Sequence, residues 1–184
     1  TDVIQLHQKG VKNVVSSSGT ALSSDQIMLV KRLTENITVI FDRDQAGINA
    51  ALRGIDLILE HGMNVRICKL DEGEDPDSLA RKHSLDHIKN FIIQNSLDFI
   101  NFKASLLATE YENEPTKKAE VINNIVKSIS LVKDIIKREL YVQTCSKIMK
   151  ISEDSIFGTL SRIKNSKENR FRNKSAQSFN IIKN

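Results

Sequence analysis

Two groups of carboxylates follow two short apolar runs in the first half of the chain. Asp42 and Asp44 come directly after residues 37–41, and five acids stand within residues 71–77, after a second run at 65–70. In a parallel sheet the carboxyl ends of the strands meet at one edge, where ligands bind. Carboxylates that converge there repel one another unless a cation lies between them, and oxygen ligands without Cys or clustered His favour Mg²⁺ or Mn²⁺. The pattern predicts a divalent-metal site suited to phosphate chemistry.

Each acidic group also has an ordinary structural interpretation. One of Asp42 and Asp44 could cap the helix that follows, and residues 71–77 could form a solvated loop. We favour the metal interpretation because the two groups follow consecutive strands, which places both loops at the same edge of a parallel sheet.

A loop of small residues at 16–20 follows a third β-branched run, at 11–15. Its Ser18, Gly19 and Thr20 allow close backbone approach and offer donors to a phosphate, although many loops between a strand and a helix share this composition. The sequence contains no G-x-G-x-x-G or Walker A pattern, so dinucleotide cofactors and P-loop ATPase chemistry are not supported. His83 and His87, at i and i+4, are interpreted as an exposed helix face.

The elements that must position these residues alternate between strand and helix patterns. Strands are expected at 11–15, 37–41 and 65–70. Helices are expected before Gly10, after a cap at Ser24, and over 46–61. Strands separated by helices predict βαβ units and a mainly parallel sheet.

Beyond Asp77 the strand patterns cease and helical periods take over. Helices are expected at 79–94, 97–111, 118–132 and 135–149, with a last helix capped by Ser152. We therefore expect an α/β unit at 1–94, a helical subdomain at 95–165, and a basic, disordered tail at 166–184.

The composition is typical of a soluble globular protein, with 40% hydrophobic and 27% charged residues and no apolar run of the ~18 residues needed to span a bilayer. Cys68 and Cys145 form no disulfide framework, which fits a reducing, cytoplasmic compartment. Residues 162–184 hold seven basic side chains and one acid, whereas residues 1–161 hold 20 basic and 22 acidic ones. This basic end could bind polyanions or remain solvated. Without an initiator Met, the chain is interpreted as part of a longer protein.

The order of these motifs resembles the Toprim region of bacterial, DnaG-type DNA primases. The matching segments are the loop at 16–22, Asp42-Arg43-Asp44 and Asp75-Pro76-Asp77, and residues 137–141 resemble the helical end of the primase polymerase core. The resemblance implies an α/β Toprim-like unit that is truncated at its N-terminus, followed by the helical subdomain of that core.

The resemblance also implies an activity, which is synthesis of short RNA primers on single-stranded DNA by two-metal nucleotidyl transfer during replication. Asp42 and Asp44 would be catalytic. The implied ligands of Mg²⁺ or Mn²⁺ are Asp42, Asp44, Asp75, Asp77 and Asp2. The implied nucleotide- or phosphate-binding residues are Ser18, Gly19, Thr20 and Arg43, the last standing where the family commonly has Gly.

The partners implied by the resemblance are a single-stranded DNA template, NTPs and the replicative helicase, the last through parts outside this chain. No membrane partner is expected, and the parent protein would act at the bacterial replisome. A Glu that the family carries just upstream of Asp2 is absent from this chain, so we expect the fragment alone to be inactive.

Two other interpretations remain open. A different Toprim protein, such as a topoisomerase, nuclease or recombination factor, would share the acidic motifs, although Tyr111 and Tyr141 both fall in expected helices. Alternatively, the chain could be a non-catalytic interaction module whose acids are merely solvated.

Overall fold

The structure is a computed structural model that describes residues 2–17, 21–41, 45–71, 73–108 and 114–166. The chain divides into two compact units, Thr1–Ser105 and Leu106–Asn184, and each is described by itself. The expected boundary at residue 94 marks a change of sequence pattern and stays a prediction. Among the residues that the structure describes, none of the helices combines the length and apolar character that crossing a bilayer requires.

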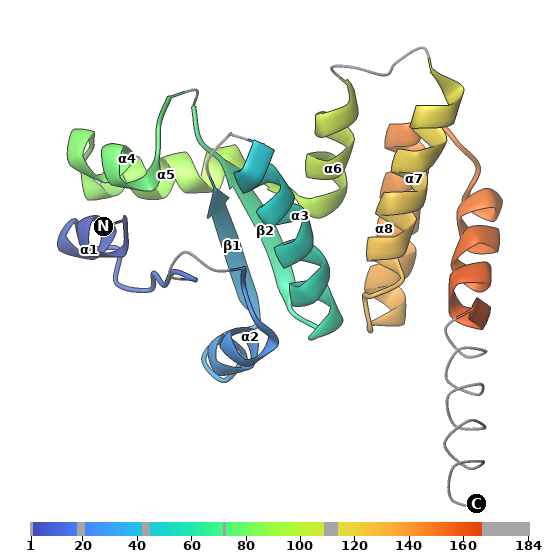
Figure 1. Ribbon diagram of the computed structural model, residues 1–184, viewed down its shortest axis with the longest axis horizontal. Helices are drawn as coiled ribbons and strands as arrows, with labels where there is room; N and C mark the ends of the chain where they lie inside the picture. Colours follow the sequence, from blue (N-terminus) through green and yellow to red (C-terminus); the bar gives the residue numbers. More distant parts are fainter. Residues whose placement is uncertain (1, 18–20, 42–44, 72, 109–113, 167–184) are drawn as a thin grey trace, which may run out of the picture. The chain divides into compact units, whose positions relative to one another are not determined.

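The first unit is built on a three-stranded sheet with the order β1-β2-β3 (Figure 1). Strand β1 (Asn36–Phe41) pairs in parallel with β2 (Asn64–Lys69), and β2 pairs antiparallel with the short β3 (Ser96–Asp98). The longer pairing is parallel, as we expected, and the short β3 adds an antiparallel pairing at the other edge of β2. Strand β3 lies where we expected helical periods alone, since its pairing with β2 is a tertiary contact.

The expected strand at 11–15 is wrong, because these residues form an irregular segment. Val11 and Val14 instead pack against a buried cluster on one side of the sheet. β-branched residues favour a strand only where a neighbouring strand supplies backbone partners, and here their apolar side chains are used in the core.

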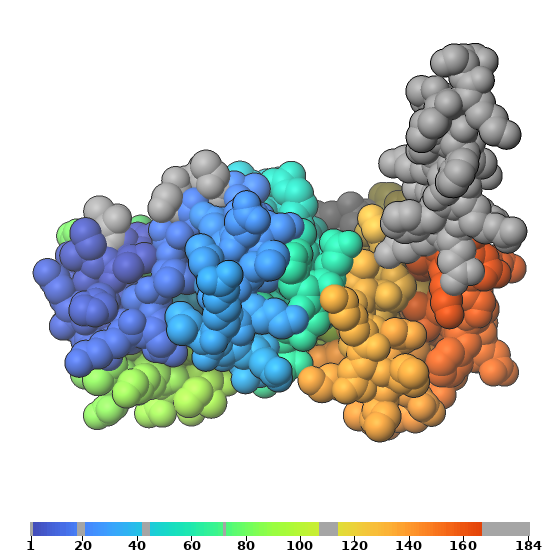
Figure 2. All heavy atoms as spheres, turned by 90° about the horizontal axis from the view of Figure 1, so that it is seen from below, coloured from blue at the N-terminus to red at the C-terminus, as the bar shows by residue number. Residues whose placement is uncertain are grey.

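Helix α3 (Gln45–Glu60) connects β1 to β2 and packs on both strands, as the helical pattern at 46–61 predicted. It is followed by Gly62, whose φ of 74° lies in the left-handed region that favours glycine after a helix. Helix α2 (Ser24–Lys31) precedes β1 and lies at the surface of the unit, where it buries only Ile27 (Figure 2). Its cap is Ser23 rather than Ser24, because Ser23 and Gln26 form a reciprocal capping box.

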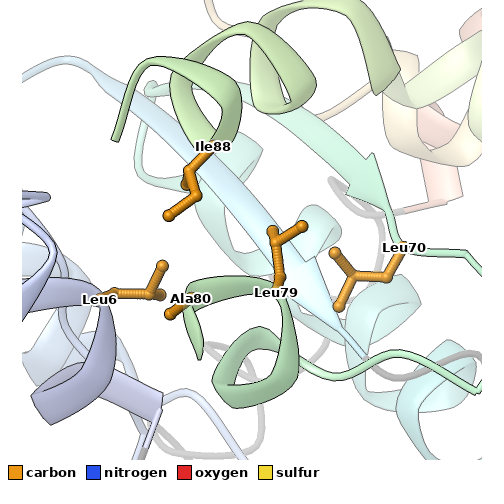
Figure 3. Close-up of a cluster of buried hydrophobic side chains, with 5 residues drawn as sticks. All are labelled: Leu6, Leu70, Leu79, Ala80 and Ile88. Carbon is orange, nitrogen blue, oxygen red and sulfur yellow. The ribbon is translucent and has the colours of Figure 1, made fainter. Parts of the chain in front are cut away.

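The segment expected as one helix at 79–94 is two helices, α4 (Pro76–Lys82) and α5 (Leu85–Asn95). Ser84 begins the second by accepting a hydrogen bond from the backbone N–H of His87 at 3.3 Å. Both helices and α1 (Asp2–Gln8) contribute side chains to a buried cluster that also includes Leu70, the residue directly after β2 (Figure 3). Its members are Leu6, Leu70, Leu79, Ala80 and Ile88.

Helix α6 (Phe99–Ala108), which lies in the first unit as far as Ser105, begins where Asp98 accepts hydrogen bonds from the backbone N–H groups of the first turn. Ile40 of β1 packs against the cluster of Figure 3, whereas its neighbour Phe41 makes an edge-on ring contact with Phe102 of α6, with centroids 5.3 Å apart. Successive strand residues point to opposite faces, so β1 contributes to two cores.

The described part of the second unit contains α7 (Pro115–Ile129), α8 (Ile135–Met149) and a further helix over 153–166. Helices α7 and α8 pack together, and α8 buries Val142, Cys145 and Met149 along one face. Asp134 caps α8 by accepting from the backbone N–H of Lys137 at 3.0 Å. These helices agree with the expected segments at 118–132 and 135–149.

Candidate functional site

The two strands that carry the acidic motifs end at the same level of the sheet. The parallel register pairs Phe41, the last residue of β1, with Lys69, the last residue of β2. The chain then continues into residues 42–44 after one strand and into residues 71–77 after the other. The structure therefore confirms that the two loops leave a common edge, which is the arrangement that ligand sites in α/β proteins use.

Asp75 is the N-cap of α4. Its Oδ1 accepts a hydrogen bond from the backbone N–H of Ser78 at 2.6 Å, and the Ser78 side chain accepts one from the backbone N–H of Asp75 at 3.1 Å. The hydrogen bond from the Ser78 backbone holds the pKa of the Asp75 carboxyl below its usual range. One carboxylate oxygen of this expected metal ligand is thus engaged in starting the helix.

Asp77, in the first turn of α4, is more enclosed than the other described ligand candidates, Asp2 and Asp75, with 17% of its side chain exposed. Its Oδ2 lies 2.8 Å from Arg81 Nε, whereas its Oδ1 is buried and finds no hydrogen-bond donor among the described residues. An anionic oxygen buried without a donor is costly, and a bound cation satisfies it. The free oxygen of Asp77 therefore fits a divalent metal ligand.

Cationic side chains on α4 neutralise part of the negative charge of the acidic segment, a feature that our sequence interpretation missed. Lys82 Nζ lies 2.9 Å from Glu74 Oε1, and Arg81 pairs with Asp77 one helical turn away. The i, i+4 spacing of Asp77 and Arg81 was a readable signal of this pairing. The pairing of Lys82 with Glu74 spans eight residues and depends on how the loop folds back.

Asp2, the remaining described ligand candidate, lies on α1 and is exposed. Helix α1 packs against α4, so the structure brings the helix that carries Asp2 alongside the helix that carries Asp77. Within the described ranges, no three His, Cys, Asp or Glu side chains are grouped so that they could hold one metal ion.

Six of the expected site residues lie outside the described residues. These are Asp42, Arg43, Asp44, Ser18, Gly19 and Thr20. The assignment of the Asp-x-Asp motif and of the phosphate loop therefore stays a prediction.

His83 and His87 do not share one helix face, contrary to our interpretation of their spacing. His83 ends α4 and His87 lies in the first turn of α5, so the break at Ser84 falls between them. Their rings nevertheless stack, with centroids 4.1 Å apart and planes inclined by 13°.

Comparison with known proteins shows which family this chain resembles. A family model described as Toprim-like matches residues 1–80, and one described as the DnaB-helicase binding domain of primase matches residues 107–154. The DNA primase of Clostridium acetobutylicum is 34% identical over 163 residues, which are 87% of this chain and 27% of that protein. Over most of its length, the chain is similar to bacterial DnaG-type DNA primases.

Solved primase structures share the fold as well. A DNA primase domain from Pseudomonas aeruginosa is 32% identical, with a TM-score of 0.74 over 87% of this chain and 51% of that one. A DnaG primase catalytic domain bound to ssDNA is 28% identical, with a TM-score of 0.69 over 79% of this chain and 48% of that one. The fold is therefore the Toprim-like part of a primase catalytic core followed by its helical subdomain. A Toprim core of this kind implies the use of divalent metal in general.

The chain spans about a quarter of the length of the curated primases it matches and about half of the solved cores. We expected any contact with the helicase to lie outside this chain, whereas the helicase-binding family model matches residues inside it, at 107–154.

Proposed function

We propose that this chain is part of a DNA primase that synthesises short RNA primers on single-stranded DNA from NTPs. The observation that carries the proposal is the common edge at which β1 and β2 end, because the Asp-x-Asp motif follows β1 in the sequence and the loop that leads to Asp77 follows β2. The similar catalytic domain that binds ssDNA supports the choice of template.

The metal ligands in this proposal are Asp42, Asp44, Asp75, Asp77 and Asp2, with Mg²⁺ or Mn²⁺ as the ion. Support comes from the buried oxygen of Asp77, which has no donor among the described residues, and from the packing of α1 on α4. The chemistry that bound divalent cations supply is activation of the attacking 3′-hydroxyl and neutralisation of charge on the departing pyrophosphate.

Other residues of the chain position the ligands or bind the substrate in this proposal. The Arg81 guanidinium, 2.8 Å from Asp77 Oδ2, orients this carboxylate so that its other oxygen is presented away from Arg81. Asp75 begins α4 and so sets the position of Asp77 two residues later. Ser18, Gly19, Thr20 and Arg43 are proposed to contact nucleotide phosphates.

The test is primer synthesis on single-stranded DNA by the full-length parent protein with Mg²⁺, comparing wild type with Asp44→Asn. We expect the variant to lose synthesis while it keeps its circular dichroism spectrum. Asp25→Asn is the matched control, because Asp25 lies exposed on α2 and has no proposed role. Synthesis by Asp44→Asn at the wild-type rate would show that Asp44 only caps a helix. No synthesis by the wild type would favour a non-catalytic module or another Toprim protein.

A second proposed function is contact with a DnaB-type replicative helicase through the second unit, because the helicase-binding family model matches residues 107–154. The test is direct titration of the purified helicase into the 184-residue chain. A chain that ends at residue 105 would serve as the control if it folds by circular dichroism. Equal binding by the two would place the contact in the first unit instead.

A further inference from the structure

A cavity of about 520 Å³ lies beside the acidic loop, between the end of that loop and helices α4 and α5. Small-molecule sites commonly begin at about 300 Å³, so this space can take a ligand the size of a nucleoside. The residues that line it are Asp71, Gly73, Glu74, Leu79, Lys82, His83, His87 and Phe91. None of these has a role in the proposed metal site.

One wall of the cavity is aromatic. The His83 and His87 rings lie nearly parallel at 4.1 Å, and His87 is exposed while His83 is half-buried. Phe91, one turn after His87, is half-buried and packs against the cluster of Figure 3, to which the fully buried Leu79 belongs. The cavity therefore has aromatic rings at its side and an apolar base formed by core residues.

Charged side chains line the rest of the cavity, which we call its rim. The ion pair between Lys82 and Glu74, at 2.9 Å, and the exposed carboxylate of Asp71 supply both donors and acceptors. A ligand that suits the whole cavity needs a flat aromatic face for the imidazoles and edge groups that both donate and accept hydrogen bonds. Nucleobases have this combination, whereas a bare phosphate would meet the carboxylates of the rim.

We propose that this cavity binds a nucleobase, which stacks on the His83–His87 pair while Glu74, Lys82 and Asp71 contact its edge. The choice of a nucleobase over other flat ligands rests on the proposed function, since both NTPs and the DNA strand carry bases. The loop that lines the cavity also continues into Asp75 and Asp77, so a base held here lies near the proposed metal edge.

The test uses the 184-residue chain and two fluorescent probes, 2-aminopurine riboside triphosphate and a single-stranded oligonucleotide that contains one 2-aminopurine. The chain contains no Trp, so the probe is excited selectively. We expect His87→Ala to weaken binding of one probe about fivefold or more, as loss of a stacked base commonly does. His87→Phe retains a ring and is expected to restore most of the affinity. His7→Ala, on the exposed side of α1, is the matched control and should bind as the wild type does.

The two probes distinguish the source of the base, since the one whose affinity falls in His87→Ala is the one that stacks. An otherwise identical abasic oligonucleotide should be insensitive to His87→Ala. The proposal is overturned if His87→Ala binds as tightly as the wild type, if His87→Phe is as weak as His87→Ala, or if the wild type binds neither probe. Primer synthesis by the parent protein, sensitive to Asp44→Asn, is measured separately, so failure at this cavity leaves the proposed function standing.

Discussion

The pair between Lys103 and Asp56 gives the sharpest stability prediction for the first unit. Lys103 on α6 is 6% exposed, and its Nζ lies 3.0 Å from Asp56 Oδ1 on α3, whose side chain is 30% exposed. Removing the Asp56 carboxylate deprives the buried Lys103 ammonium of an anionic partner. Removing Lys103 instead leaves the Asp56 carboxylate, which water can reach. We therefore expect the two single substitutions to differ strongly in their effects on the free energy of unfolding.

Breaking one side of a fully buried ion pair costs about 3–5 kcal/mol. Because Asp56 is partly exposed, water can enter after its truncation, and we expect Asp56→Ala to lower the free energy of unfolding by about 2–3 kcal/mol. Lys103→Met keeps the apolar stem and removes the buried charge, so its cost should stay within about 1 kcal/mol. The double variant should resemble Lys103→Met, since no buried ammonium remains in it.

The assay is urea denaturation followed by circular dichroism at 222 nm, with the slopes compared among variants to check that the transition is unchanged. Glu114→Ala is the control, because Glu114 pairs with Lys117 at 3.2 Å but both side chains are largely exposed. We expect this change to cost less than about 0.5 kcal/mol. A cost for Lys103→Met equal to that of Asp56→Ala would refute the reasoning, since packing of the lysine stem would then outweigh the desolvation of its charge.

Three further outcomes follow from local features. Asp75→Ala should lower the free energy of unfolding by about 1 kcal/mol through loss of the α4 cap. Because the folded-state pKa of Asp75 is lowered, this difference from wild type should be complete above about pH 4 and fade as the pH falls below it. Thermal melts from pH 7 to pH 3 measure it. Burial raises the pKa of the Cys145 thiol to about 11, so iodoacetamide at pH 8 should modify this thiol far more slowly in the native chain than in urea. The stability that comes from keeping the thiol protonated should be lost as the pH rises from about 8.5 towards 11. Lys150 ends α8 with φ 54° and ψ 51°, so Lys150→Gly should raise the free energy of unfolding by about 1 kcal/mol in urea titrations; a decrease would show that the lysine makes a compensating contact.

The cavity beside α4 and the acidic edge of the sheet are two adjoining proposed sites of the first unit. In these proposals the edge of the sheet supplies carboxylates that bind metal, whereas the adjoining cavity offers rings and an apolar base. Both depend on α4, because Asp75 and Asp77 begin this helix and Lys82 and His83 end it. A change that displaces α4 should therefore disturb the two sites together, whereas His87 substitutions should affect the cavity alone.

The sequence by itself predicted the helices and strands whose hydrophobic period and end signals lie within the element. Strands β1 and β2, the connecting helix α3, and the pair α7 and α8 all lie close to their expected positions. Their hydrophobic periods match the geometry of one element, and caps such as Asp134 mark their ends. The order of the acidic motifs along these elements was also sufficient to indicate the family.

Only the tertiary structure decided the features that depend on partners distant in sequence. Residues 11–15 have strand composition but no strand beside them, whereas Ser96–Asp98 pair with β2 from within a helical pattern. Similarly, the Glu74–Lys82 and Asp56–Lys103 pairs and the stacking of His83 on His87 require the chain to fold back on itself. Spacing indicates which side chains share one element, but a contact between elements depends on packing. Packing also buries Asp77 Oδ1 where it has no hydrogen-bond donor among the described residues, which its place in a run of acids did not predict.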